Sequence, residues 1–317
     1  MHNSHYIKII TEAANAMGID VELLAEDWAI ELKRGESTKY IIGYLFPLND
    51  ATTCKIANNK NLCSEILSRR NVPNVPHQIT FSPSKLVERR KTIGNSGLFE
   101  NFIFKYGFPF LVKRNNSSKG RGVFLVKNEA EFENILSKLY SIDDAFSLSP
   151  FRKEIREYRC IVLDGECLLV YEKQIPFIIG NGISTILELL AAFINDFKGK
   201  MNSKKPVFDE SMALRFSEIP TKGEKVFMQW QHNRFLGTTY KKITDVRIVD
   251  LAIEAAEAIG ARFVSVDIIQ SEKFGLEVLE INASVVIHSP IISGSEGTQF
   301  DGTGKIFQLA IRKAFKI

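Results

Sequence analysis

The stretch Val264–Asn282, VSVDIIQSEKFGLEVLEIN, decides how the fold of this chain is interpreted. Two runs rich in β-forming residues flank the turn-forming letters EKFG, a pattern that predicts an antiparallel hairpin. If the turn is centred between Lys273 and Phe274, Asp267 lies directly opposite Glu280, because the numbers of opposed residues then have a constant sum. Glu280 and Asn282 share one face of their strand because side chains alternate with a period of two.

Three oxygen-bearing side chains therefore converge within strands that are otherwise apolar. Two facing carboxylates repel each other unless a cation lies between them, and a hard cation such as Mg²⁺ prefers oxygen ligands. The segment predicts a metal site formed by Asp267, Glu280 and Asn282. The alternative is a structural hairpin whose polar residues simply face the solvent.

A second polar segment, FLVKRNNSSKGRGV, begins at Phe110. A lysine near the end of a strand, followed by serines, glycines and cations, offers backbone N–H groups, hydroxyls and positive charge to a polyphosphate. The spacing of a P-loop is absent, and a plain polar hairpin loop of the same composition is the alternative. The candidate nucleotide contacts in this segment are Lys113, Ser117, Ser118, Lys119, Gly120 and Gly122.

A second hairpin is predicted around Asp164-Gly165, because this dipeptide between β-rich runs is a strong turn signal. With a two-residue turn, Glu157 faces Glu172 and Arg159 faces Val170, so that one face carries two acids and a base. Such a face is unusual in a core and ordinary in solvent. The residues alone leave both a functional and a structural interpretation open.

The remaining pattern predicts alternating helices and strands. A helix over 5–17 and strands over 19–25, 28–33 and 39–46 form a small α/β lead-in, and a helix capped by Asn49 or Asp50 follows. Further helices are predicted over 61–70, over 129–140, from the capping box of Thr185 and Glu188 to residue 194, and from Thr244 or Asp245 to Gly260. Residues 196–225 have no clean period, which indicates either a substrate-facing loop or a surface insertion.

Composition narrows the class of protein. The 317 residues are 45% hydrophobic and 25% charged, as in ordinary globular proteins, and the formal net charge of +4 is scattered, which favours local anion sites over a nucleic-acid surface. Four irregularly spaced cysteines do not suggest a disulfide scaffold, and no stretch approaches the roughly eighteen apolar residues of a membrane span. We therefore expect a cytoplasmic protein that binds neither nucleic acid nor membrane.

The order of these motifs resembles that of the ATP-grasp superfamily. The matching letters are Asn59-Lys60 before a helix, VK with the glycine-rich loop, EYR at 157–159, GNGISTILEL at 180–189, VDI at 266–268 and LEINA at 279–283. The resemblance covers roughly residues 47–317, and it is most evident to the ligase modules of cyanophycin synthetases and of bifunctional glutathione synthetases.

The resemblance implies an α+β fold of the ATP-grasp kind, in which two subdomains clasp ATP. The expected domains are an α/β lead-in over 1–75 and an ATP-grasp domain over 76–317, divided into a nucleotide-lid subdomain over 76–150 and a metal and substrate subdomain over 151–317. It also implies ATP and two Mg²⁺ ions as cofactors.

The resemblance assigns roles to individual residues. Lys60 and Lys113 would contact the ATP phosphates, the loop Ser117–Gly122 would close over them, and Glu154 would lie in the hinge that binds adenine and ribose. Arg159 and Lys173 would place positive charge near the γ-phosphate or an acyl phosphate. Asp267, Glu280 and Asn282 would hold magnesium, and the further candidate substrate contacts are Asn233, Arg262 and His288.

The implied activity is that of a carboxylate-amine ligase that acts through an acyl phosphate on an amino acid or small peptide. A phosphotransferase of the same fold and a non-catalytic nucleotide-binding module are the alternatives, and a homodimer is compatible with the sequence. Two departures, Asn181 in place of the usual aspartate and Ser284-Val285 in place of the usual Pro-Gly, lie near the acceptor side. They bear on the identity of the substrate more than on ATP binding.

Overall fold

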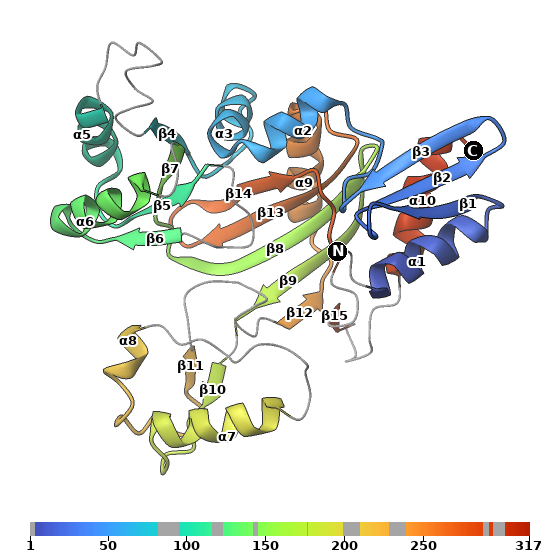
Figure 1. The fold of residues 1–317 in the computed structure, drawn as a ribbon. Coiled ribbons are helices and arrows are strands. Elements are labelled where there is room, and N and C mark those ends of the chain that lie inside the picture. Colours follow the sequence, from blue (N-terminus) through green and yellow to red (C-terminus); the bar gives the residue numbers. More distant parts are fainter. Residues whose placement is uncertain are drawn as a thin grey trace.

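A computed structural model describes residues 4–81, 95–115, 123–141, 145–175, 177–198, 210–227, 239–287, 292–293 and 302–317. The described residues form four β-sheets with helices packed on them (Figure 1). No helix among these residues is both long enough and apolar enough to cross a membrane.

The largest sheet has six strands in the order β14-β13-β8-β9-β12-β15 and lies in the centre of the molecule (Figure 1). Neighbouring strands run antiparallel except for the last pair, β12 and β15. The predicted hairpins over 157–173 and 263–281 are both present within it. Its strands are β8 (Glu154–Leu163), β9 (Glu166–Gln174), β12 (Thr239–Lys242), β13 (Phe263–Ser271), β14 (Gly275–Asn282) and β15 (Ile292–Ser293).

One face of this sheet is covered by helices α2 (Ala51–Asn58), α3 (Lys60–Arg69) and α9 (Val246–Ala258). Alternate residues of the central strands, such as Val264 and Val266, pack into this core because the period of a strand places them on one side. Asp50 caps α2 by accepting a hydrogen bond from the N–H of Thr53, and Asp245 caps α9. The predicted helix starts are therefore confirmed, with Asp50 and Asp245 as the capping residues.

Part of the opposite face is covered by a layer formed from both ends of the described chain. The strands β1 (Asp20–Leu24), β2 (Ala29–Arg34) and β3 (Ser37–Ile42) make a three-stranded sheet, and the helices α1 (Ser4–Asn15) and α10 (Thr303–Phe315) pack beside it (Figure 1). The ring of Tyr6 meets that of Phe307 at a centroid distance of 5.5 Å. The α/β lead-in predicted from the first 46 residues thus has its strands and first helix, and α10 completes its core.

A second layer stands beside the edge strand β14. Strands β4 (Gln78–Phe81), β7 (Ala145–Pro150), β5 (Phe110–Arg114) and β6 (Val123–Val126) form a four-stranded sheet in that order. The helices α5 (Asn95–Tyr106) and α6 (Glu129–Tyr140) cover its outer face through an aromatic core that includes Phe102, Phe110 and Phe146. Lys113 is on the other face, since side chains alternate along β5.

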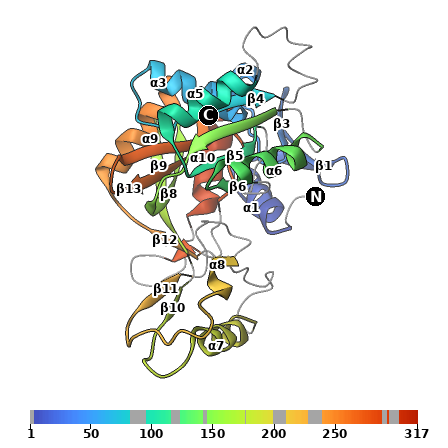
Figure 2. The same ribbon diagram turned by 90° about the vertical axis from the view of Figure 1, so that its left-hand side faces the viewer.

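A small lobe projects from the rest of the molecule (Figures 1 and 2). It contains β10 (Phe177–Ile179), β11 (Lys225–Phe227), α7 (Ile186–Lys198) and α8 (Glu210–Ala213). The capping box that opens α7 is confirmed, because the Thr185 N–H donates to Glu188 and the Glu188 N–H donates to the Thr185 hydroxyl at 2.8 and 3.3 Å. Gly180 is required here, since a Cβ would lie 2.2 Å from the Thr221 carbonyl oxygen.

Candidate functional site

The predicted opposition of Asp267 and Glu280 is confirmed, although the turn differs from the one assumed. The strands pair from Ser271 with Gly275, which leaves a three-residue turn, and an unpaired Leu279 then shifts the register by one residue. This β-bulge restores the pairing of Asp267 with Glu280. Glu280 and Asn282 lie on one face, and the Asn282 amide donates to the Glu280 carboxylate at 3.2 Å.

The predicted register of the β8–β9 hairpin is wrong by one residue at its functional end. The Asp164-Gly165 turn is present, but Leu168 forms a bulge between the pairs Val162–Cys167 and Ile161–Leu169. As a result Glu157 opposes Lys173, and Arg159 opposes Tyr171. The face that was expected to carry two acids and a base therefore carries alternating charges that neutralise one another.

A buried charge network lies on this face of the central sheet. Arg159 donates from Nε and Nη2 to the two oxygens of Asp267 at 2.7 and 2.6 Å, and Lys173 Nζ lies 3.1 Å from Asp267 Oδ1. Lys173 also contacts Glu157, and both side chains are 8% exposed. Arg159 and Lys173 thus occupy one site, as the sequence motifs implied, with Asp267 between them.

The electrostatics of the network favour its charged forms. Burial alone would raise the pKa of Asp267, but Arg159 and then Lys173 outweigh it and hold that pKa well below its usual range. Burial would likewise lower the pKa of Lys173, yet Asp267 and Glu157 raise it above its usual value. Asp267 and Lys173 therefore stay ionised near neutral pH, and each stabilises the charge of the other.

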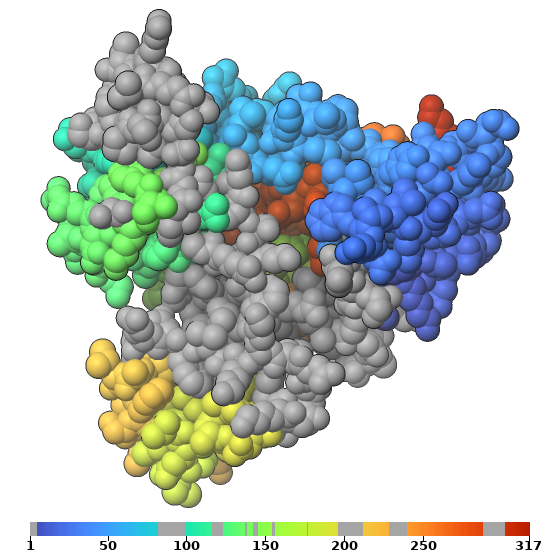
Figure 3. All heavy atoms as spheres, in the orientation of Figure 1, coloured from blue at the N-terminus to red at the C-terminus, as the bar shows by residue number. Residues whose placement is uncertain are grey.

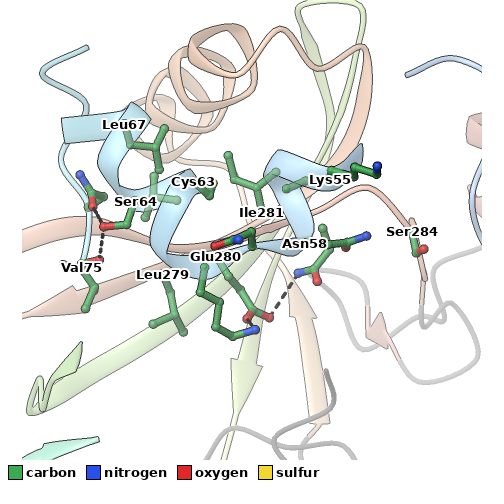
Figure 4. A pocket seen from close by; sticks show the side chains of 16 residues that line it. Lys55, Asn58, Cys63, Ser64, Leu67, Val75, Leu279, Glu280, Ile281 and Ser284 are labelled. Atoms are coloured by element: carbon green, nitrogen blue, oxygen red, sulfur yellow. Dashed lines mark hydrogen bonds and ion pairs between the residues drawn. The ribbon is translucent and has the colours of Figure 1, made fainter. Parts of the chain in front are cut away.

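Glu280, by contrast, lies at the edge of the sheet beside a pocket. Lys60 at the start of α3 places its Nζ 3.5 Å from Glu280 Oε2, and the two side chains are 12% and 28% exposed. The pocket has a volume of about 610 Å³. It is lined by residues of α2, α3 and β14, with Lys55 and Asn58 toward one end and Ser64, Leu67 and Val75 toward the other (Figure 4).

The same neighbourhood is visible on the molecular surface. In the space-filling view, the light-blue atoms of the α2–α3 segment border the orange-red atoms of the β14 region (Figure 3). Glu280 of β14 and Lys60 of α3, which lie 3.5 Å apart, thus come from segments far apart in the sequence. Because both are only partly exposed, their charges are less screened by water than those of surface residues.

His77 lies within electrostatic reach of the two lysines that the motifs assign to phosphate. Its Nδ1 lies 2.9 Å from the Val75 carbonyl oxygen, which can only accept, so Nδ1 carries the proton. Its Nε2 is buried and has no hydrogen-bond partner among the described residues. Burial first, and then the charges of Lys113 and Lys60, hold the pKa of His77 well below its usual range. Sequence reasoning missed this residue, because a lone histidine after a proline-containing link carries no periodic signal.

The other predicted site residues fall into two groups. Arg262 directly precedes β13, five residues before Asp267, and forms a bidentate pair with Asp164 at 2.8 and 3.0 Å. Glu154 begins β8, and its side chain is outside the described residues. Seven further candidates also lie outside them: Ser117, Ser118, Lys119, Gly120, Gly122, Asn233 and His288.

The residues present partly fit a magnesium ion. Among the described residues, no group of three or more His, Cys, Asp or Glu side chains could hold a metal. Magnesium, however, is usually held by one or two carboxylates together with substrate phosphates. Glu280 and Asn282 offer such a donor pair at the pocket edge, whereas Asp267 already has both oxygens engaged by Arg159 and Lys173.

Comparison with known proteins gives consistent matches. Residues 57–175 match the model of the RimK-like ATP-grasp domain. The bifunctional glutathione biosynthesis protein of Enterococcus faecalis is 25% identical over 282 residues, which cover 81% of this chain and 35% of that protein. Cyanophycin synthetase of Trichormus variabilis is 22% identical over 280 residues, covering 83% and 29%. The chain therefore spans about a third of the length of the curated relatives that it matches.

Solved structures match as well. A bifunctional glutathione synthetase from Pasteurella multocida aligns with a TM-score of 0.57 at 19% identity, covering 96% of this chain and 44% of that one. A D-alanine–D-alanine ligase from Bacillus anthracis aligns with a TM-score of 0.50 at 14% identity, covering 84% and 69%. Both kinds of protein that the motifs suggested are among these relatives, so the predicted resemblance is confirmed.

Proposed function

The chain has the ATP-grasp fold, and on that premise we propose that it is an ATP- and magnesium-dependent ligase joining a carboxylate to an amine through an acyl phosphate. One observation carries the proposal. Lys60 Nζ lies 3.5 Å from the Glu280 carboxylate at the edge of a pocket. By the family resemblance, this lysine would contact phosphate and this carboxylate would hold magnesium. Phosphate and metal would therefore meet at one point.

Different residues at the site would bind the phosphates and the metal during phosphoryl transfer. Bound ATP would supply the phosphoryl group and magnesium would neutralise its charge. Lys60 and Lys113 would hold the phosphates, and Glu280 with the Asn282 oxygen would hold the metal. These positive groups offset the repulsion that arises when a substrate carboxylate approaches the γ-phosphate.

Arg159 stabilises the acyl phosphate in this proposal. Its Nε and Nη2 are held by the two oxygens of Asp267, which fixes the orientation of the guanidinium. Lys173 adds positive charge at the same place, and Asp267 fixes both cations in orientation. Because the network is mostly buried, it acts in a medium of low dielectric, where such charges are worth more than in water.

The finer aspects of the proposal are supported mainly by the sequence. We propose an amino acid or small peptide as substrate, two magnesium ions, and a cytoplasmic location; a homodimer stays a prediction. At the first departure from the relatives, the side-chain oxygen of Asn181 accepts from the N–H groups of Ile183 and Ser184, so an amide serves this turn. At the second, Ser284 lines the pocket and Val285 is fully buried. We expect the substrate to differ most around Ser284.

The direct test is the product formed by the purified protein. Amino acids and short peptides are screened in pairs for ADP release with ATP and magnesium, and hydroxylamine is added to trap an acyl phosphate as a hydroxamate. ADP and phosphate that appear only when an acid and an amine are both present would support the ligase. A stable phosphorylated product would indicate a phosphotransferase instead. If ATP with magnesium does not change the melting temperature, the proposal is wrong at its first step.

A further inference from the structure

The four-stranded sheet is joined to the rest of the chain by only two links. Residues 70–77 connect α3 to β4, and residues 151–153 connect β7 to β8. Everything between them, including Lys113 on β5, belongs to one unit that is covalently attached at these two places. The contacts of the two links therefore help to set where Lys113 lies relative to Glu280, together with the Ile79 N–H of β4, which donates to Asn61 Oδ1 of α3 at 2.9 Å.

The first link docks on the backbone of β14. The Val75 N–H donates to the Val278 carbonyl oxygen at 2.9 Å, and the Val278 N–H donates to the Pro73 carbonyl oxygen at the same distance. Asn74 forms a parallel bridge with Val278. The link thus extends the central sheet locally beyond its edge strand, through backbone hydrogen bonds to Val278.

The second link docks on the neighbouring residue of β14 through a side chain. Arg152 donates from Nε and Nη2 to the two oxygens of Glu277 at 2.8 and 3.0 Å. The two side chains are only 9% and 8% exposed. The guanidinium also lies 3.7 Å from the centroid of the Phe274 ring, in the turn of the same hairpin. A two-pronged, desolvated contact of this kind fixes orientation as well as distance.

The two links therefore meet β14 at two consecutive residues, Glu277 and Val278, which lie three and two positions before Glu280. We propose that Arg152 and Glu277 are positioning residues, which hold the sheet that carries Lys113 at the orientation where Lys113 and Glu280 act on one nucleotide. This inference rests on the proposed function of the same site. It assigns the ion pair a geometric role, which agrees with the small net stability that buried ion pairs usually provide over apolar replacements.

The test measures whether Lys113 loses its effect when the pair is broken. ATP affinity is measured for the protein with and without Lys113→Ala, first with Glu277 intact and then with Glu277→Gln. Loss of a charged hydrogen bond predicts about a tenfold weakening from Lys113→Ala in the first background. In the second background we expect Lys113→Ala to weaken ATP affinity by less than about threefold, because a misoriented lysine contributes little to that affinity.

Two further variants serve as a control and as a second way to break the ion pair. Arg69→Gln breaks the exposed pair with Glu65, where Arg69 Nε and Nη2 lie 3.1 and 2.6 Å from the same carboxylate oxygen, and should leave the tenfold effect unchanged. Arg152→Lys keeps the charge but loses the fork, so it should also reduce the effect of Lys113→Ala and serves if Glu277→Gln does not fold. An equal effect of Lys113→Ala in all backgrounds would overturn the inference.

A second measurement does not depend on nucleotide. Hydrogen exchange of the amides of Val75 and Val278 should accelerate about tenfold or more in Glu277→Gln, and not in Arg69→Gln, because the second link no longer holds β14 against the first. If wild-type protein fails to bind ATP, the proposed function fails while this measurement still tests the ion pair. Unchanged exchange would show that the pair does not hold the two sheets together.

Discussion

Asp267 and Glu280 oppose each other across neighbouring strands and yet lie in contrasting surroundings. Asp267 is 2% exposed, and its two oxygens receive Arg159 and Lys173. Glu280 is 28% exposed as a side chain, with a single lysine at 3.5 Å and an amide at 3.2 Å. One carboxylate is saturated by protein cations, and the other has coordination capacity left.

Two opposed residues on neighbouring strands therefore have different roles, a structural one for Asp267 and a ligand-binding one for Glu280. Facing acids repel each other, so the sequence predicts a cation between the two carboxylates. In the structure each acid has cations of its own, so the repulsion is relieved by the protein. We therefore expect Asp267 to matter mainly for the network and Glu280 mainly for ligands.

Asp267→Asn should have the largest effect. It leaves Arg159 and Lys173 without their shared counter-charge in a buried site, which predicts a loss of about 3–5 kcal/mol in the free energy of unfolding. Denaturant unfolding measures it, with Asp250→Asn on the outer side of α9 as the control. A loss below about 1 kcal/mol would erase the contrast between the two acids.

Glu280→Gln should leave stability nearly unchanged and reduce catalysis. Removing one electrostatic group that acts on the developing charge predicts a fall in kcat of about 10²- to 10³-fold. The measurement is ADP release at saturating ATP and magnesium, once a substrate pair is found, together with the melting temperature. Full turnover in this variant would remove Glu280 from the proposed metal site.

Lys60→Gln tests the ligand-binding role of the Glu280 site through the lysine that lies beside it. A lost charged hydrogen bond to phosphate is worth about 1.5–3 kcal/mol, so ATP affinity should weaken by roughly tenfold to a hundredfold. Titration calorimetry with ATP and magnesium measures the change, and Lys55→Gln, which changes another lysine that lines the same pocket, is the matched control. Equal effects of both variants would mean that general positive charge, and not the position of Lys60, binds the nucleotide.

The pH dependence of stability should show the smallest effect. The pKa of Asp267 is lowered on folding, so its ionised form stabilises the protein above the unfolded value of about 3.9, and this contribution is lost as pH falls toward the lower folded pKa. Only part of it is lost by pH 4, which makes the effect smaller than that of the substitution. Between pH 6 and pH 3, the free energy of unfolding should fall more steeply with decreasing pH for wild type than for Asp267→Asn. Parallel curves would contradict the lowered pKa.

The two hairpins show how far the sequence predicts the site. Both contain a bulge that no residue pattern announced, at Leu279 and at Leu168. In the first hairpin the bulge offset a turn that was also misjudged, and the predicted pairing of Asp267 with Glu280 was correct. In the second the turn was correct and the bulge displaced every later pair, so Lys173 replaced Glu172 opposite Glu157. Turn residues alone therefore do not fix a register when the strands are long.

Other parts of the structure depend on long-range packing. Most helix starts were predictable because capping is local, as Asp50 and Asp245 show. The convergence of His77 with Lys60 and Lys113 depends on how a link lies against β14, and local sequence does not encode it. The roles of the glycine-rich loop, Asn233 and His288 stay predictions, because these residues lie outside the described part of the chain.

The packing of α10 against α1 has a consequence for synthesis on the ribosome. Tyr6 and Phe46 emerge early, yet both complete their contacts with Phe307, which emerges more than two hundred residues after either of them. During translation the first three strands thus expose apolar surface until the last helix arrives. We expect nascent chains halted before α10 to bind holdase chaperones and to resist proteases only after residues 303–315 have been released.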